Sequence, residues 1–284
     1  MAVRSILFYL SGCFTLTLLL VVVKFASLKY QLPFEQVLFL RQFFIVLSML
    51  PFMIKDKFNP LKAKNLSLQL KRHGLFCIST LLWYNALMLA PVNDVIGISS
   101  IAPVIGAILA IVILKETPKK GMFMAFVICL IGSLIIKKPT FNKHIDDAMM
   151  GYIFAIFVVL IRGYIAILNK KLTNSLDIKY IMYFLNTMMM LFFAMFFYKF
   201  KAIPLQMMPY ILFSSAAFFI EYFLINIAYK NSSASLLQPL DFSKPIFSIL
   251  LSYLILSEQP SFQQIAGVFV ILIGYLYLIV RNKK

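Results

Sequence analysis

The sequence predicts an all-α membrane protein in which ten transmembrane helices form two inverted five-helix repeats. Hydrophobic residues make up 62% of the 284 residues and charged residues only 13%, which is too little charge to cover a soluble domain. Apolar stretches of about 20 residues, the length that crosses a bilayer, recur along the whole chain. The chain also repeats itself, and the repeat divides it into two halves.

The repeat is clearest around two prolines. The chain reads APVIGAILAIVILKETP around Pro103 and KPIFSILLSYLILSEQP around Pro245. Matching residues stand 142 positions apart, half of the chain length: Pro103 with Pro245, Glu116 with Glu258, Pro118 with Pro260, and Gly132 with Gly274. We therefore expect two repeat domains, residues 1–142 and 143–284. Duplicated membrane proteins are commonly secondary transporters with a site between the halves.

Ten apolar runs, taken in order, predict the helices. The first half supplies Val3–Leu28, Phe34–Ile54, His73–Leu89, Asp94–Leu114 and Gly121–Ile136, separated by Lys29, the basic link Lys55–Arg72, the turn Ala90–Asp94 and the stretch Lys115–Lys120. The second half supplies Met149–Leu168, Ile178–Tyr198, Pro204–Tyr229, Ala234–Leu256 and Phe262–Val280, separated by Lys170–Lys179, Lys199–Lys201, the turn Asn231–Ser233 and Glu258–Pro260. The link Lys55–Arg72 is expected to be either a helix along the bilayer surface or a loop.

The orientation follows from the positive charges. Five helices per half is an odd number, so the second half enters the membrane the opposite way round. With the N-terminus inside, inner loops and tails hold 17 of the 27 Lys and Arg residues and outer loops hold 6. Both termini are therefore expected in the cytoplasm, with the chain in a bacterial inner membrane and the lipid bilayer as a partner. The first apolar run is too long for the core of a cleaved signal peptide.

Other function classes lack their signatures. The net charge of +17 sits mostly in short loops between apolar runs, so a nucleic-acid surface is not expected. Cys13, Cys77 and Cys129 lie in apolar runs at unrelated spacings and read as small hydrophobic residues, with neither a disulfide nor a metal site. No nucleotide-hydrolysis motif occurs. We expect a protein that is not an enzyme and that uses no cofactor.

The repeated pattern resembles a known family. Each half has a proline, a glutamate thirteen residues later and a glycine in the next helix, in PVIGAILAIVILKE with Ile131-Gly132 and in PIFSILLSYLILSE with Ile273-Gly274. This pattern resembles the EamA-type drug/metabolite transporter superfamily. The resemblance implies a central cavity enclosed by the first four helices of each half, with the fifth and tenth at the periphery. It also implies substrates such as amino acids, sugars, nucleotide sugars, cationic drugs or S-adenosylmethionine.

The repeated prolines and glutamates can each be explained either by a structural role or by a functional one. Pro103 and Pro245 each remove a backbone hydrogen bond inside a predicted helix, so they are candidate hinges beside the site, with a plain kink as the alternative. Glu116 and Glu258 lie at helix exits beside prolines, where capping of the next helix is the simpler account than ion binding.

Charges inside apolar runs are the main candidate site residues. A charge near the bilayer centre costs about 2.5–3.5 kcal/mol, so each needs a partner or a function. Lys24 and Arg41 lie near helix ends, where their stems could instead carry the charge to the interface. Arg162 lies too deep for that and shares a helix face with Asn169, so it needs an acidic partner or an anionic substrate. Glu221 is also deep.

The ninth predicted helix carries a line of polar residues. Gln238, Asp241, Lys244 and Ser248 share one face, and Asp241 can form an ion pair with Lys244. A purely structural pair is the alternative. However, the repeat places Ser99 and Ala102 at the matching positions, so the fold itself does not require charges there.

Three neighbouring residues of the third predicted helix complete the candidate set. Trp83 and Tyr84 could stack on a planar ring or a cation, and Asn85 is a polar neighbour. Interior packing explains them equally well.

Together these residues predict a secondary transporter of a small polar or zwitterionic, amino-acid-like metabolite that works by alternating access. Arg162 and Lys244 would hold an anionic group, and Asp241 and Glu221 would hold a cationic group or a proton. Trp83 and Tyr84 would face a flat or apolar part. The alternatives are an S-adenosylmethionine uptake carrier, an exporter of cationic drugs and a lipid-headgroup flippase. A homodimer is an open alternative to a single chain.

Overall fold

A computed structural model describes residues 2–57, 65–90, 95, 98–99, 101–115, 121–137, 145–256 and 259–282 of the chain, and it is helical throughout. The first half contains α1 (Ala2–Tyr30), α2 (Phe34–Lys55), α3 (Leu66–Leu89), α5 (Ala102–Leu114) and α6 (Met122–Lys137). The second half contains α7 (Ile145–Ser175), α8 (Ile178–Ala194), α9 (Met208–Asn231), α10 (Ala234–Leu237), α11 (Ser243–Leu256) and α12 (Phe262–Asn282). Short 3-10 turns lie at η2 (Phe197–Lys199), η3 (Leu205–Met207) and η4 (Gln238–Phe242). Each predicted span has a helix among the described residues; of the fourth, Asp94–Leu114, the structure describes residues 95, 98–99 and 101–114.

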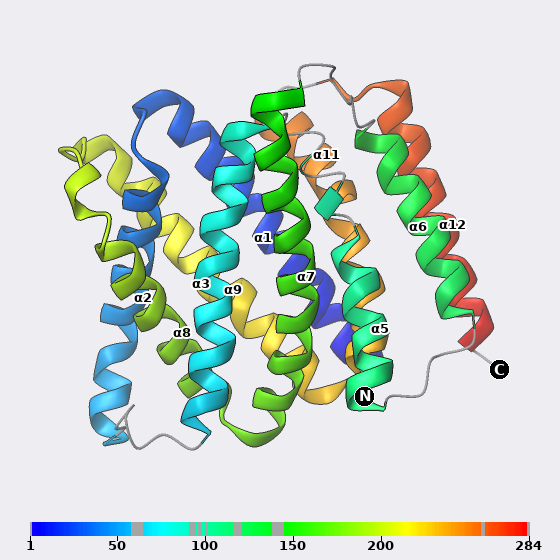
Figure 1. The fold of residues 1–284 in the computed structure, drawn as a ribbon, viewed down its shortest axis with the longest axis horizontal. Helices are drawn as coiled ribbons and strands as arrows, with labels where there is room; N and C mark the ends of the chain where they lie inside the picture. The colour runs from blue at the N-terminus through cyan, green and yellow to red at the C-terminus, as the bar shows by residue number, and fades with distance from the viewer. Residues whose placement is uncertain are drawn as a thin grey trace.

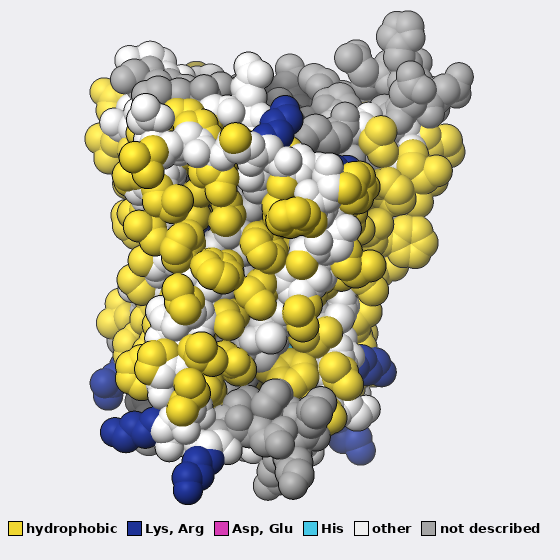
Figure 2. Space-filling model, turned by 90° about the vertical axis from the view of Figure 1, so that its left-hand side faces the viewer, with side chains coloured by type: hydrophobic (Ala, Val, Ile, Leu, Met, Phe, Trp, Pro, Cys, Tyr) yellow, Lys and Arg dark blue, Asp and Glu magenta, His cyan; other side chains and the backbone are white. Residues whose placement is uncertain are grey.

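The chain belongs in a membrane by the length and composition of its helices. Among the described residues, four helical stretches are long and apolar enough to cross a bilayer alone: Arg4–Val22, Phe34–Lys55, Met149–Ser175 and Leu205–Asn231. Figure 2 shows one side of the bundle, where a broad hydrophobic belt covers the middle and Lys and Arg side chains appear only near the ends. Such a belt faces lipid, so the protein is a multi-pass membrane protein. Both termini lie at the same end of the bundle (Figure 1).

Helix packing follows a two-fold rule between the halves (Figure 1). In the first pair of related contacts, α1 packs against α9 and α3 against α7. In the second, α5 packs against α7 and α11 against α1. The repeat relates α2 to α8 and α6 to α12, so the contact between α2 and α8 and the contact between α6 and α12 are each unchanged when the halves are exchanged. Exchanging the halves therefore leaves this set of contacts unchanged, as two repeats of opposite orientation require.

The repeated glycines make the contact between α6 and α12. A Cβ added to Gly132 would lie 2.8 Å from the backbone oxygen of Gly267. A Cβ added to Gly274 would lie 2.5 Å from the sulfur of Cys129. Each glycine therefore allows the opposite helix to approach closely, and any larger residue at either position would force neighbouring atoms to move. The two contacts are related by the repeat, since Gly132 matches Gly274 and Cys129 matches Ile271.

Three predicted helices differ clearly from the structure. The sixth helix was expected over Met149–Leu168, but α7 runs from Ile145 to Ser175. The third helix was expected to begin at His73, but α3 begins at Leu66, so His73 is fully buried inside the helix. The ninth helix was expected to run unbroken over Ala234–Leu256, but it is interrupted by the 3-10 segment η4 between α10 and α11. Pro239 and Pro245 lie within this stretch, and their missing N–H groups remove two hydrogen bonds that a continuous α-helix would need.

Candidate functional site

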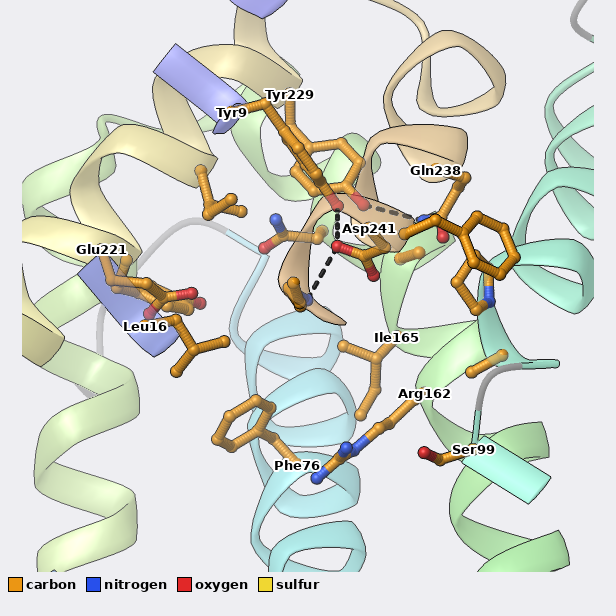
Figure 3. Close-up of a pocket in the computed structure, with 18 of the residues that line it drawn as sticks. Tyr9, Leu16, Phe76, Ser99, Arg162, Ile165, Glu221, Tyr229, Gln238 and Asp241 are labelled. Carbon is orange, nitrogen blue, oxygen red and sulfur yellow. Dashed lines mark hydrogen bonds and ion pairs between the residues drawn. The ribbon is translucent and has the colours of Figure 1, made fainter. Parts of the chain in front are cut away.

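A cavity of about 360 Å³ lies between the two halves, in the middle of the bundle (Figure 3). Its walls come from α1, α3, α5, α7, α9, η4 and α11, together with Ser133 of α6 and Ser99. None of the lining residues belongs to α2, α8 or α12. Apart from Ser133, the lining comes from the first four helices of each half and the segments that join them, which is the arrangement that the resemblance implies.

The frame of the cavity is symmetric, but its charges are not. Four pairs of lining residues are related by the repeat: Phe76 with Phe218, Ser99 with Asp241, Ala102 with Lys244, and Pro103 with Pro245. The aromatic and proline pairs are conserved between the halves, whereas Asp241 and Lys244 replace small neutral residues. Both prolines lie just after a break in their span, since Pro103 is the second residue of α5 and Pro245 the third of α11. Their role as hinges stays a prediction.

Asp241 lies at the centre of a group of polar contacts. Its Oδ1 atom lies 2.7 Å from the Lys244 Nζ and accepts hydrogen bonds from the Tyr9 hydroxyl at 3.0 Å and the Cys13 thiol at 3.8 Å. All three contacts fall on one oxygen, and Oδ2 has no partner among the described residues. The side chains of Lys244 and Asp241 are 35% and 22% exposed, so the ion pair lies at the cavity surface (Figure 3).

Tyr9 and Tyr229 form an aromatic corner above Asp241 (Figure 3). Their rings meet edge to face with centroids 5.9 Å apart, and the Gln238 Nε2 donates to the Tyr229 hydroxyl at 2.8 Å. Gly106 allows Gln238 this position, because a Cβ on Gly106 would lie 2.9 Å from the Gln238 amide carbon. Lys170 holds the end of α9 by donating to the backbone oxygen of Tyr229 at 2.6 Å.

Arg162 enters the cavity from α7 and forms no ion pair with any acidic residue that the structure describes. Its guanidinium carbon lies 4.7 Å from the centroid of the Trp83 ring, which it covers. Trp83 does not itself line the cavity; it packs beside the cluster of Ala86, Ala90 and Ala155 and supports the arginine from behind. This contact brings together two predicted site residues from different halves.

Glu221 enters from α9, on a different side from Arg162 (Figure 3). Phe218, one turn earlier on α9, lines the same cavity, and the buried Arg41 guanidinium lies 4.2 Å from its ring centroid. The ion pairs of the described residues are Lys179–Asp56, Lys199–Glu35 and Lys244–Asp241, so Glu221 belongs to none of them.

Two further polar residues line the cavity. The sequence did not single out Arg72, and it indicated Asn169 only as a residue on the same helix face as Arg162. Arg72 of α3 lines the cavity and is 2% exposed, although the sequence placed it at the end of a basic link, either a helix along the bilayer surface or a loop. Its Nη1 donates to the His73 Nδ1 at 2.8 Å, and its guanidinium lies 5.1 Å from the centroid of the Tyr222 ring. Asn169 lines the cavity on the same helix as Arg162 and is 3% exposed. Its side-chain oxygen has no hydrogen-bond partner among the described residues.

Tyr84 and Asn85 do not line the cavity. Tyr84 stacks on Phe34 with ring centroids 4.5 Å apart, beside a second cavity of about 50 Å³ that Arg41 also lines. Asn85 donates to the Leu81 backbone oxygen of its own helix at 2.8 Å. Lys24 lies in α1, but its side chain is outside the described part of the structure, as are Glu116 and Glu258. Trp83 and Tyr84 are consecutive helical residues, about 100° apart, so they do not point to the same place.

The model of the EamA-like transporter family matches residues 3–137 and 149–280 of the chain, one match in each half. The chain belongs to this family. The EamA-like assignment agrees with the helix order, the repeat and the central cavity, and it makes the protein a transporter rather than an enzyme.

Curated relatives of this EamA-like chain are uptake transporters. Three are described as "S-adenosylmethionine uptake transporter", each aligned over 88% of this chain and 84% of the relative. They come from Rickettsia prowazekii (strain Madrid E), with 25% identity, Rickettsia bellii (strain RML369-C), with 25%, and Rickettsia conorii (strain ATCC VR-613 / Malish 7), with 23%. A solved crystal structure matches with a TM-score of 0.83 over 100% of this chain and 99% of that one, at 13% identity, which supports the fold alone.

Proposed function

We propose that this EamA-like protein is a secondary transporter of a small zwitterionic, amino-acid-like metabolite. The observation that carries the proposal is two opposite charges on different sides of one membrane cavity, Arg162 on α7 and Glu221 on α9, neither of which forms an ion pair within the described part of the chain. Leaving such charges unpaired in a bilayer is costly, and a ligand that bears a carboxylate and a cation compensates both.

The remaining polar atoms support the same ligand. Arg162 presents a planar set of donors that suits a carboxylate. The free Oδ2 of Asp241, the Asn169 side-chain oxygen and the Glu221 carboxylate are acceptors that suit an ammonium group. Phe76 and Phe218 supply apolar walls for the rest of the molecule.

The break in the ninth span and the two-fold packing support alternating access. In transporters built from inverted repeats, the two halves exchange conformations around a fixed central site. Pro103 and Pro245 lie at matched positions beside that site and are the proposed hinges.

S-adenosylmethionine is a specific second candidate, and the similarity to the rickettsial uptake transporters favours it. The molecule has a carboxylate, an ammonium, a sulfonium and an adenine ring. The cavity offers arginines, acceptors and aromatic rings for these groups. Three cationic side chains in the cavity weigh against the alternative of an exporter for cationic drugs.

The transport proposal is tested in proteoliposomes. We expect uptake of a labelled amino-acid-like zwitterion or of S-adenosylmethionine to saturate, and to be lost in Arg162→Met. Lys230→Met, which removes an exposed lysine at the end of α9, is the matched control and keeps uptake. If Arg162→Met transports as well as the wild type, or if no such compound is taken up, the proposal is wrong.

The proposed orientation places both termini in the cytoplasm of a bacterial cell. Ser67 at the start of α3 and Gln206 in η3 are exposed and lie at opposite ends of the bundle. In a variant without native cysteines, a membrane-impermeant thiol reagent added to intact cells should label Gln206→Cys and leave Ser67→Cys unlabelled. The reverse pattern would overturn the orientation, and labelling of both would contradict the inverted repeats.

A further inference from the structure

Resting on the proposed function, we propose that the substrate is an acidic zwitterion, with one cationic group and two anionic groups, rather than a neutral or net cationic amino-acid-like molecule. The inference comes from the balance of charges that the cavity leaves uncompensated. It narrows the substrate class and separates this chain from carriers whose ligand has a net positive charge.

Among the residues that the structure describes, the cavity holds more positive than negative side chains. Its cations are Arg72, Arg162 and Lys244, and its anions are Glu221 and Asp241. Lys244 and Asp241 compensate each other at 2.7 Å. What remains is two guanidinium groups against one carboxylate, an excess of one positive charge.

Within the described part of the chain, the recorded contacts of the two arginines are with neutral groups. Arg162 lies over the Trp83 ring, and Arg72 contacts the His73 and Tyr222 rings. The Arg72 Nε has no hydrogen-bond partner among the described residues. A guanidinium does not lose its proton in proteins, so both charges persist. If Glu221 binds a proton, the positive excess grows by one, and the sign of the balance stays the same.

The neighbourhood of the cavity adds to this excess. Arg41 lies behind Phe218, 7% exposed, and belongs to none of the ion pairs of the described residues. A neutral zwitterion bound to Arg162 and Glu221 would leave Arg72 uncompensated in a low-dielectric site, which is costly. A second anionic group on the ligand compensates Arg72. Bidentate pairing of each arginine with a carboxylate or phosphate then becomes available.

The protein carries its own reporter for this test. Trp83 is the one tryptophan in the sequence, and it lies directly under the Arg162 guanidinium. A ligand acid that binds Arg162 changes the environment of this ring, so Trp83 fluorescence reports binding in purified protein. Probes are used in pairs that differ by one anionic group: glutamate with glutamine, aspartate with asparagine, and phosphoserine with serine. S-adenosylmethionine, with a net positive charge, is added as a seventh probe.

We expect the acidic member of at least one pair to bind at least tenfold more tightly than its neutral partner. Arg72→Gln should reduce that ratio to near one, while Arg72→Lys should restore part of it. If Arg72→Gln does not fold, Arg162→Gln takes its place. The preference for acidic over neutral probes is then measured by their competition with uptake in proteoliposomes. Lys230→Gln, which removes an exposed charge outside the cavity, should leave the ratio unchanged.

The outcomes separate the two levels of the proposal. If glutamine, asparagine, serine or S-adenosylmethionine binds more tightly than every acidic probe, the acidic-substrate inference is wrong and the zwitterion carrier stands. If none of the seven probes binds or is transported, the proposed function fails and the inference fails with it. A preference for acidic probes that survives both Arg72→Gln and Arg162→Gln would also overturn the inference, because the charge balance would not be its cause.

Discussion

Removal of one charge from the Lys244–Asp241 pair should cost more stability than removal of both. The pair has a Nζ–Oδ1 distance of 2.7 Å and side chains 35% and 22% exposed, so it is intermediate between a buried and a surface ion pair. Breaking a buried pair costs about 3–5 kcal/mol and a surface pair about 0.2–1 kcal/mol. We therefore expect Lys244→Met to lower the free energy of unfolding by about 2 kcal/mol.

The two single variants should differ in a defined direction. Lys244→Met leaves the less exposed partner, the Asp241 carboxylate, with donors only from Tyr9 and Cys13. Asp241→Asn leaves the more exposed Lys244, and asparagine can still accept from the Tyr9 hydroxyl. The lysine change should therefore be the more costly one. The double variant should recover stability to within about 1 kcal/mol of the wild type, because no isolated charge remains.

Transport should respond differently from stability. Thermal unfolding in detergent gives the stability of the four proteins, and uptake in proteoliposomes gives their activity. We expect all three variants to be transport-dead, including the stable double variant, while Lys230→Met behaves as wild type. An active double variant would reduce the pair to a structural role. Single-variant costs that simply add in the double variant would show that the ion pair contributes nothing.

Three further outcomes are expected. Glu221→Gln should abolish accumulation driven by a pH gradient and keep exchange between equal pools; continued accumulation would remove Glu221 from any role in proton coupling. Gly132→Ala, whose Cβ would lie 2.8 Å from a backbone oxygen of α12, should lower stability by about 1–3 kcal/mol, whereas Gly74→Ala, with nothing within 4 Å, should not. The Lys179 ammonium group lowers the pKa of Asp56 at the end of α2. This contact therefore stabilises the protein above the ordinary aspartate pKa of about 3.9 and is lost as the pH falls below it. The melting-temperature difference between wild type and Asp56→Asn should thus be present at neutral pH and vanish in acid; an unchanged difference would contradict the ion pair.

The site residues that could be predicted from the sequence are charged residues inside apolar runs. Arg162, Glu221, Asp241 and Lys244 stand out because a charge in an apolar run is expensive, and all four line the cavity. The repeat likewise pointed to the space between the halves. For Trp83 the sequence left a substrate contact and interior packing equally open; the ring lies under the Arg162 guanidinium and does not line the cavity.

The residues that were missed depend on packing that a single sequence does not display. Arg72 follows a run of basic residues that reads as a loop, and only the packing of α3 against α7 and α8 places it inside the bundle. Tyr9 and Tyr229 are two of 14 tyrosines, and no local pattern separates them from the others. One available signal was the spacing of Gln69, Arg72 and Phe76, which places all three on one helical face.

The excess positive charge of the cavity would make the proposed transport cycle sensitive to voltage. Moving one elementary charge through the full membrane field changes its free energy by about 2.3 kcal/mol per 100 mV. If alternating access shifts the cavity across part of that field, the membrane potential acts on the empty carrier and draws its positive site towards the negative side. A bound acidic zwitterion cancels that charge, so the loaded carrier moves with little electrical work. The membrane potential would then control the rate at which the unloaded carrier returns, rather than the rate at which the loaded carrier delivers its substrate.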